Sequence, residues 1–319
     1  MHTALRHRVR AFVFTLNAPL VIGAVLALLI ITTLLAAPFI TDQSPVKMNL
    51  PTAGNSHIAY PAPPGTPGHP LGTDVEGRDM LARLLYGGRY TLIICTITAL
   101  ARILIGTTIG LLAGWYPRLR WLMNSIISAW SAVPPIFFAL FMLEILARIF
   151  FKLPRFGPKN ASVLLTDAMI FTIFMSLTGW PEIAIRCQTA TIGLSRQPFI
   201  EAAKVIGLRR ATVLWRHVLP NLHTLLLPEA INALAAALLL LAELGFLRIF
   251  IGGGTEDLNG SKYLIPLYAE WGSMVALSLR QRNQGYWILI EPLLAFTLSI
   301  VAFSLMAEGL RRRHSPGAH

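Results

Sequence analysis

The amino-acid sequence predicts an all-α polytopic membrane protein with about six transmembrane helices. Apolar residues make up 55% of the 319 residues and charged residues only 13%, whereas about a quarter of a soluble protein is charged. The apolar residues form long blocks, and a bilayer crossing takes about 20 such residues in a helix. The net charge of +12 suits a chain bordered by anionic lipid headgroups. The Lys and Arg residues form no stripe interleaved with aromatic residues, so the sequence does not favour nucleic acid as a partner.

Six stretches are predicted to span the bilayer, at residues 19–40, 90–115, 121–146, 163–185, 222–251 and 287–306. The first could be a signal peptide, because Arg6, Arg8 and Arg10 precede it. Its apolar run exceeds the roughly 7–15 residues of a signal sequence and no clear cleavage site follows, so we expect an uncleaved anchor. The fourth stretch is the weakest, because it contains Asp167 and Pro181.

The distribution of Lys and Arg favours an inner N-terminus and an inner C-terminus. The segments that would then be inner hold Arg6, Arg8, Arg10, Arg118, Arg120, Arg186, Arg196, Lys204, Arg209, Arg210, Arg216, Arg311, Arg312 and Arg313. The outer segments hold Lys47, Arg78, Arg83, Arg89, Arg148, Lys152, Arg155, Lys159, Lys262, Arg280 and Arg282 over a greater total length. The cluster from Arg148 to Lys159 argues against this orientation, so the inner placement of residues 201–221 depends partly on their motif.

The segment between the first two spans has two parts. Residues 41–70 are rich in Pro and Gly and are typical of a loop. In residues 71–89, Asp74 could cap a helix, and Leu81, Leu84 and Leu85 lie at helical spacing. We therefore expect a short amphipathic helix on the outer surface. This divides the chain into residues 1–89 and a five-helix core, residues 90–319, with a polar loop at about 186–221.

The polar loop is predicted to contain two short helices around a glycine. Residues 201–206 favour a helix, Gly207 suits the left-handed position that ends one, and Pro220 stops or bends a second helix over 211–218. Val205, Ile206 and Leu208 offer an apolar surface beside charged neighbours. That mixture suits insertion into a partner's groove or contact with the lipid surface, and composition alone leaves the two interpretations nearly even.

Several motifs, taken together, resemble those of ABC importer permeases. Glu201-Ala202-Ala203, three residues, Gly207 and then Val218-Leu219-Pro220 are similar to the cytoplasmic signature of that family. The agreement extends to the second permease subunit of dipeptide, oligopeptide and nickel transporters through Leu71-Gly72-Thr73-Asp74, Gly77-Arg78-Asp79, Leu84-Leu85-Tyr86-Gly87, His217-Val218-Leu219-Pro220-Asn221, Glu243-Leu244-Gly245, Trp271-Gly272 and Glu308-Gly309-Leu310-Arg311. The chain departs from the pattern at Ser304, Ala307-Glu308, Arg248 and residues 252–268.

The resemblance implies a MetI-like fold of type I ABC importer permeases and a function. The chain would form half of a translocation pathway for peptides, or for nickel or another small solute. Docking on a cytosolic ATPase would be carried by Glu201, Ala202, Ala203, Gly207, Leu219 and Pro220. The implied partners are a second homologous permease subunit, two cytosolic ATP-binding subunits or domains, and an extracytoplasmic solute-binding protein. The location would be a bacterial or archaeal inner membrane, with both termini cytoplasmic.

Ionisable residues inside predicted spans are candidates for the translocation path, because charge in lipid is costly. Arg102 and Glu243 are the best examples, and they could line the path or pair with each other. Gly106, Gly110 and Gly114 recur every fourth residue and favour close helix packing. Pro134-Pro135 is expected to kink the third span.

The sequence favours no catalytic or cofactor site. It has no P-loop, so we expect no ATP hydrolysis by this chain; ATP and Mg would be used by partner subunits. No cluster has metal-ligand spacing, and Cys95 and Cys187 are interpreted as packing residues. The main alternative is an ion-coupled secondary transporter that acts without an ATPase. Such a protein would favour paired acidic residues at mid-membrane and broken helices in matching halves.

Overall fold

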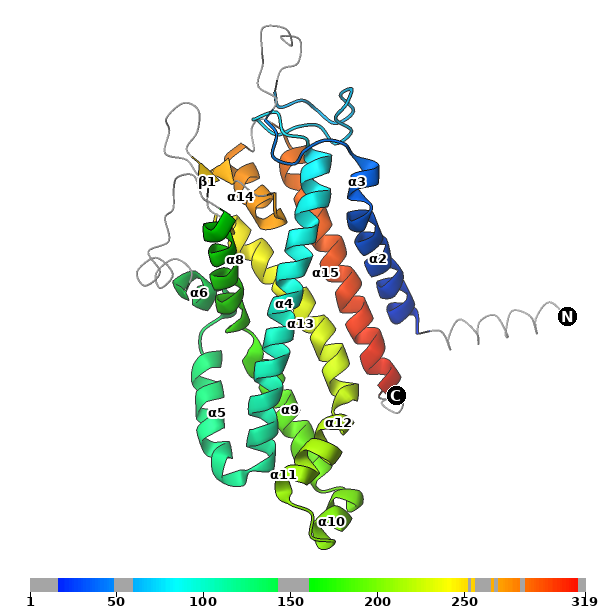
Figure 1. Ribbon diagram of the computed structural model, residues 1–319, viewed down its shortest axis with the longest axis vertical. Helices are drawn as coiled ribbons and strands as arrows, with labels where there is room; N and C mark the ends of the chain where they lie inside the picture. The colour runs from blue at the N-terminus through cyan, green and yellow to red at the C-terminus, as the bar shows by residue number, and fades with distance from the viewer. Residues whose placement is uncertain are drawn as a thin grey trace, which may run out of the picture.

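The computed structural model describes residues 17–48, 60–142, 161–251, 254–255, 265–266, 269–281 and 285–314. These residues form an elongated helical bundle (Figure 1). Its elements are α2 (Ala18–Leu35), α3 (Ala37–Ile40), α4 (Met80–Trp115), α5 (Pro117–Ser131), α6 (Pro135–Leu140), α8 (Ala161–Ser176), α9 (Trp180–Ser195), α10 (Pro198–Val205), α11 (Arg210–Val213), the π-helix η2 (Leu214–Val218), α12 (Leu219–Asn221), α13 (His223–Phe246), β1 (Gly254–Thr255), β2 (Ile265–Pro266), α14 (Trp271–Gln281) and α15 (Trp287–His314). Strands β1 and β2 are two residues each and pair antiparallel. The all-α prediction is confirmed.

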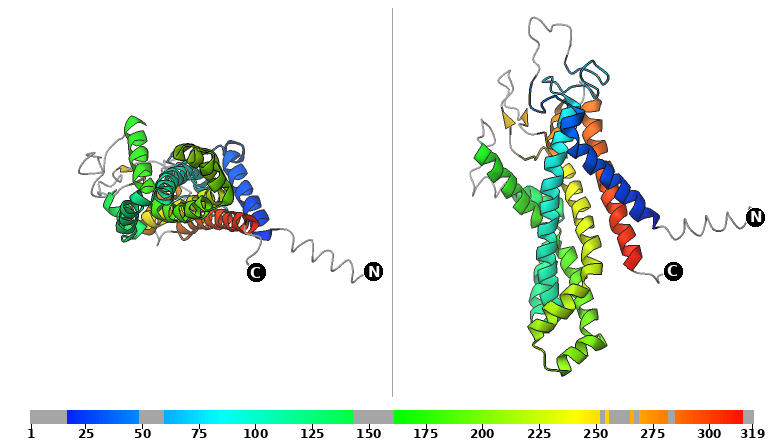
Figure 2. Two further views of the ribbon diagram at one scale, coloured as in Figure 1. Left: turned by 90° about the horizontal axis from the view of Figure 1, so that it is seen from below. Right: turned by 45° about the vertical axis from the view of Figure 1, so that its right-hand side comes forward.

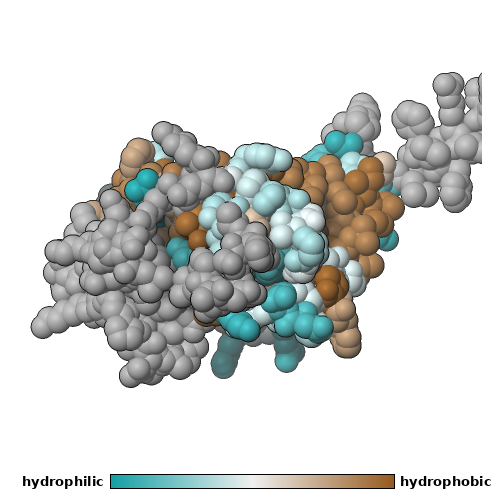
Figure 3. Space-filling view, turned by 90° about the horizontal axis from the view of Figure 1, so that it is seen from above, coloured by the Kyte–Doolittle hydropathy of each residue, from teal (hydrophilic) through white to brown (hydrophobic). Residues whose placement is uncertain are grey.

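Four described helices are long and apolar enough to cross a membrane: α2, α4, α13 and α15. A fifth crossing would be formed by residues 168–176 of α8 with α9, which meet at an angle of 42°. These five correspond to predicted spans one, two, four, five and six. Apolar side chains form the flank of the bundle on the α2 side, while paler and hydrophilic residues gather over the α14 end (Figure 3).

Two predicted spans are interrupted. The third, 121–146, divides into α5 and α6, because Pro134 has ψ 140° and the chain leaves the helix before Pro135; its residues 143–146 lie outside the described residues. The fourth breaks at Gly179, which has a φ of 69°, and α9 then continues to Ser195. The prediction that this span ends at residue 185 is therefore wrong, and residues 186–195 of the expected polar loop are helical.

The expected separate amphipathic helix at residues 71–89 is also wrong. Gly72 and Gly77 have positive φ, so residues 71–79 form turns, and α4 runs without a break from Met80. Asp79, not Asp74, caps the helix by accepting a hydrogen bond from Ala82 N at 2.7 Å. Asp74 instead accepts from Arg78 Nε at 2.7 Å, which holds the turn together.

Glycines set the closest helix contacts. A methyl group added at Gly106 would lie 2.7 Å from Ile183 Cβ, and one at Gly114 would lie 2.6 Å from Thr191 Cβ. The glycine stripe therefore packs α4 against α9 within this chain. At the crossing of α2 and α15, a methyl at Gly23 would lie 2.6 Å from Ala302 O, and Asn17 Nδ2 donates a hydrogen bond to Gly309 O.

Three of the family motifs, those at residues 84–87, 243–245 and 271–272, meet at the α14 end of the bundle. Trp271 is buried; its indole Nε1 donates to Leu84 O at 2.8 Å. The carbonyl of Ala269 occupies the place that a side chain at Gly87 would need, and Gly272 O would lie 2.7 Å from a methyl at Gly245. These glycines therefore allow α4, α13 and the start of α14 to pack backbone against backbone.

Candidate functional site

A polar hairpin, residues 197–222, forms the end of the bundle farthest from α14 (Figures 1 and 2). It contains α10, α11, η2 and α12. Helix α9 ends at Ser195 just before it, and α13 begins at His223 just after it. The start of α2 and the end of α15 also point toward this end of the bundle (Figure 1).

Gly207 ends the first hairpin helix in the predicted left-handed conformation, with a φ of 84°. Leu208 N donates to Ala203 O at 3.3 Å, and Gly207 N donates to Lys204 O at 3.1 Å. This pair of bonds is a Schellman motif, which satisfies the last carbonyl groups of α10. Glycine is favoured here because a Cβ would be strained at positive φ.

The inner face of the hairpin is packed onto the end of α4. Ile200, Ala203, Val213 and Val218 form a buried cluster with Leu111 of α4. The Lys204 ammonium lies 5.4 Å from the centre of the Trp115 ring, a cation–π distance. The hairpin and this end of α4 therefore form one packed unit.

The outer face of the hairpin exposes apolar side chains among charged ones. Val205 is 86% exposed and Ile206 75% exposed, and Phe199 is exposed nearly two turns earlier. We call these three residues the apolar tip. Such side chains are common on a surface that a partner covers.

The predicted docking residues divide between the two faces of the hairpin. Glu201, Ala202 and Gly207 are exposed, and so is Pro220 at the start of α12. Ala203 is 6% exposed and belongs to the buried cluster, and Leu219 is half-buried against it. These two residues are thus placed to support the hairpin from within.

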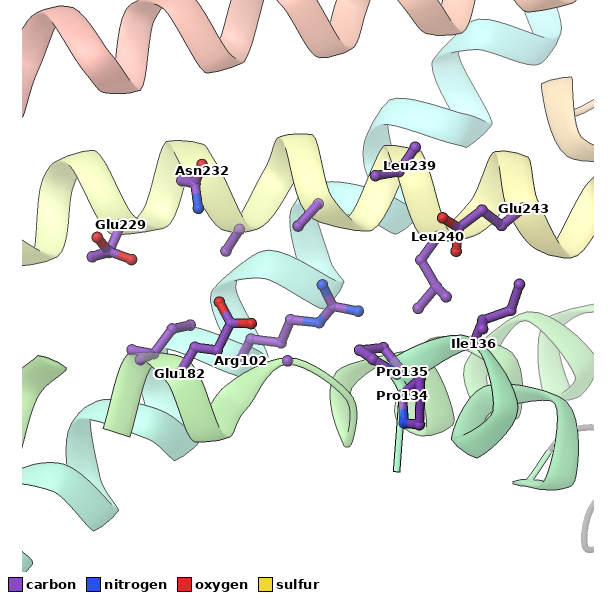
Figure 4. Close-up of a pocket in the computed structure, with 14 residues that line it drawn as sticks. Arg102, Pro134, Pro135, Ile136, Glu182, Glu229, Asn232, Leu239, Leu240 and Glu243 are labelled. Carbon is purple, nitrogen blue, oxygen red and sulfur yellow. The ribbon is translucent and has the colours of Figure 1, made fainter. Parts of the chain in front are cut away.

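A cavity of about 340 Å³ opens between α4, α9, α13 and the break between α5 and α6 (Figure 4). Its walls include both helix interruptions, at Pro134-Pro135 and at Gly179. Non-helical backbone at membrane depth is tolerated where it is buried or lines a water-filled cavity. Both candidates for the path, Arg102 and Glu243, line this cavity.

Arg102 and Glu243 form no ion pair with each other in the described part of the chain. Arg102 is 3% exposed. Its Nη2 donates to Met175 O at 3.0 Å and to Thr178 Oγ1 at 2.5 Å, and its Nε donates to Met175 O at 3.2 Å. Arg102 therefore binds the end of α8, where carbonyl groups lose their helical partners and a positive charge is favourable.

Sequence reasoning did not single out Glu182, Glu229 and Asn232, which also line the cavity. A signal for Glu229 and Asn232 was present: residues 229, 232, 236, 239 and 243 recur at intervals of three or four, so they share one face of α13. Glu182 lacked such a signal, because the break at Gly179 decides which way the first turn of α9 faces.

Glu229 joins three helices at the hairpin end of the cavity. It is 4% exposed; Arg186 Nη1 of α9 lies 2.5 Å from Glu229 Oε1, and Arg311 Nε of α15 lies 3.8 Å from the same oxygen.

The two predicted packing cysteines, Cys95 and Cys187, are buried and free. Among the described residues no three His, Cys, Asp or Glu side chains are grouped to hold a metal ion.

The comparisons with known proteins agree with this geometry. Residues 106–318 match the family model described as the binding-protein-dependent transport system inner membrane component. A Brucella suis protein assigned as a peptide transport system permease is 31% identical over 91% of this chain and 85% of its own length. The dipeptide transport system permease protein DppC of Alkalihalophilus pseudofirmus is 27% identical over 92% of this chain and 85% of its own. DppC of Escherichia coli K12 is 28% identical over 95% and 90%.

The match covers the hairpin, the cavity helices α9 and α13, and the last part of α4, from Gly106 to Trp115. The chain therefore belongs to the family of inner membrane permease components of binding-protein-dependent transport systems, and it is a multi-pass membrane protein.

Proposed function

We propose that this chain is the permease subunit of an ATP-driven importer, forms half of its translocation pathway and couples to a cytosolic ATPase through the hairpin. One observation carries the proposal. The hairpin is inserted between α9 and α13, and both helices line the charged cavity. Whatever moves the hairpin therefore pulls directly on two walls of the cavity.

The packing of the hairpin supports its use as a lever. Its buried cluster is continuous with Leu111 of α4, the helix that supplies Arg102 to the cavity. An ATPase that binds the apolar tip and changes shape with ATP would move α4, α9 and α13 together. The contact transmits energy only if its free energy differs between the two shapes.

The proposed assembly follows from the family. A second homologous permease subunit supplies the other half of the path, two ATP-binding subunits or domains dock on the hairpins, and a solute-binding protein delivers cargo at the α14 end. ATP and Mg belong to the ATPase partners, and this chain is not itself an enzyme. The hairpin, the N-terminus and the C-terminus lie in the cytoplasm of a bacterium or archaeon.

The proposed cargo is a short peptide, because the relatives named above are permeases of peptide and dipeptide transport systems. No contact among the described residues favours nickel over a peptide.

The docking role is tested at the apolar tip. Val205→Glu together with Ile206→Glu adds charge at two exposed positions, so it should leave the fold intact and abolish docking. We expect the variant to insert in the membrane, to lose co-purification with the ATP-binding subunit and to lose ATP-driven uptake of a dipeptide. Val46→Glu, at an exposed apolar position near the opposite end, is the matched control and should retain both.

Two results would contradict the proposal. Normal docking and uptake by the double variant would mean that the apolar tip contacts lipid or water instead of an ATPase. Uptake driven by a proton gradient through the purified chain alone would support the ion-coupled alternative.

A further inference from the structure

Helix α13 carries a polar stripe along a wall of the cavity. Its Glu229, Asn232 and Glu243 line the cavity together with the small residues Ala233 and Ala236. Glu243 lies fourteen positions after Glu229, so the stripe is about 21 Å long at about 1.5 Å per residue. An otherwise apolar helix that presents such a stripe to a cavity defines a route for polar cargo.

Two of the ionic groups at the cavity are occupied by the protein itself. Arg102 is bound to the end of α8, and Glu229 is bound by Arg186. They hold helices together and have little capacity left for cargo.

Glu182 and Glu243 are different. In the described part of the chain neither forms an ion pair or a side-chain hydrogen bond, although both line the cavity. Figure 4 shows them on opposite walls, Glu182 on α9 and Glu243 on α13. Along the length of α13, the Arg102 guanidinium is drawn between Glu229 and Glu243.

Glu182 lies at a helix terminus that opens on the cavity. It lies in the first turn of the 16-residue helix α9 and is exposed toward the cavity. The unsatisfied N–H groups at a helix N-terminus favour a negative charge in that turn.

We propose that Glu182 and Glu243 make this half of the path selective for positively charged groups of the cargo. Rings of carboxylates select cations in membrane pores because their charge replaces part of the lost hydration. The cavity wall also contains a cation, Arg102; it keeps its charge, but its hydrogen bonds to the end of α8 fix it in the wall, and it is only 3% exposed to cargo. This inference rests on the proposed function: in a peptide permease, the groups received would be the terminal amine and the ammonium groups of basic side chains.

The test uses the complete importer, with its ATPase and solute-binding protein, reconstituted in proteoliposomes. Initial uptake rates are measured for lysyl-alanine and glutamyl-alanine, which differ in net charge by two units. The variants are Glu182→Gln, Glu243→Gln and the double substitution, because Gln keeps the shape and removes the charge. The Lys/Glu rate ratio of each variant is divided by that of the wild type, which cancels the preference of the unchanged solute-binding protein.

We expect this quotient to fall about tenfold in the double variant and by less in each single variant, as for the loss of a charged contact. Glu308→Gln, on α15 outside the cavity, is the control and should leave the quotient near one. A quotient within about twofold of one in the double variant would overturn the inference. A wild-type importer that takes up neither dipeptide would instead overturn the peptide permease assignment, so the two failures are distinguishable.

Discussion

At the scale of single residues, two helix ends show the same backbone geometry with different residues. Gly207 ends α10 and Arg248 ends α13, with φ values of 84° and 60°. At the second site Ile249 N donates to Leu244 O at 2.9 Å and Arg248 N donates to Gly245 O at 2.9 Å, which is again a Schellman motif. Arg248 is also one of the positions at which the chain departs from the family pattern. Because its φ is positive, its side chain is strained there.

Gly207→Ala should destabilise the protein by about 1 kcal/mol, because alanine at positive φ is strained. The measurement is the midpoint of thermal unfolding in detergent, which should fall by about 2 °C. Gly193→Ala is the matched control: Gly193 is inside α9 with nothing within 4 Å of an added methyl, so alanine there should be neutral or stabilising. Equal effects at both sites would show that the left-handed turn contributes nothing.

Arg248→Gly should act in the opposite direction. Relief of the left-handed strain outweighs the greater entropy of glycine in the unfolded chain, so the gain is about 0.5 kcal/mol. The same thermal midpoint should rise by about 1 °C. A decrease would mean that the Arg248 side chain stabilises the end of α13 by more than its backbone strain costs.

At the scale of elements, the sequence showed which helices have small faces but not what those faces contact. The glycine stripe on α4 packs on α9, and Gly309 packs on α2.

Gly110→Ile should destabilise the α4–α9 contact by about 3 kcal/mol. The reason is that a Cβ at this position would lie only 2.7 Å from Cys187 Cβ, and the added atoms also meet the α9 backbone. Thr108→Ile, on the exposed side of α4, is the control. Purified yield and thermal midpoint should drop for Gly110→Ile alone, and a tolerated isoleucine at both sites would contradict this packing.

Glu270, which precedes α14, gives that element a pH dependence. Burial raises the pKa of its carboxyl from 4.5 to about 7, although Gly272 N donates to Glu270 Oε2 at 2.7 Å and opposes the shift. The folded state therefore holds a proton that the unfolded state releases. The stabilisation is complete below pH 4.5 and is lost as the pH rises through 7.

The thermal midpoint of the wild type should fall between about pH 5 and pH 8, by an amount that corresponds to about 3 kcal/mol. Glu270→Gln should reduce this slope, since the substituted side chain carries no titrating proton. Glu308→Gln should retain it. An unchanged slope in Glu270→Gln would assign the pH dependence to other groups.

At the scale of the whole molecule, Glu229 connects the cavity to three helices. Because Arg186 and Arg311 are partly exposed, with side-chain exposures of 42% and 39%, solvent screens the two contacts. Glu229→Gln should therefore cost only about 1–2 kcal/mol. The difference in thermal midpoint from the wild type should shrink at high salt, where surface ion pairs are screened. Glu308→Gln removes contacts within α15 alone and should cost less stability. A larger loss of stability in Glu308→Gln than in Glu229→Gln would contradict the view that Glu229 holds α9, α13 and α15 together.

Local patterns predicted much of the candidate site. The left-handed Gly207 was predicted from glycine's lack of a Cβ, and the exposed Val205 and Ile206 from their place between charged residues. The family motifs identified the hairpin, and the cost of charge in lipid identified Arg102 and Glu243. These inferences depend on residues that are close in sequence.

The amino-acid sequence by itself determined the fold class, five of the apolar spans and the family, because span length, apolar content and motif order are properties of the chain. The tertiary structure alone decided that α9 and α13 flank both the hairpin and the cavity, that Arg102 binds α8, and that Glu182 and Glu243 line opposite walls of one cavity. These relations depend on helix breaks at Gly179 and Pro134 and on backbone contacts at glycines, which orient residues far apart in sequence. No local pattern encodes those orientations, because they result from how whole helices pack.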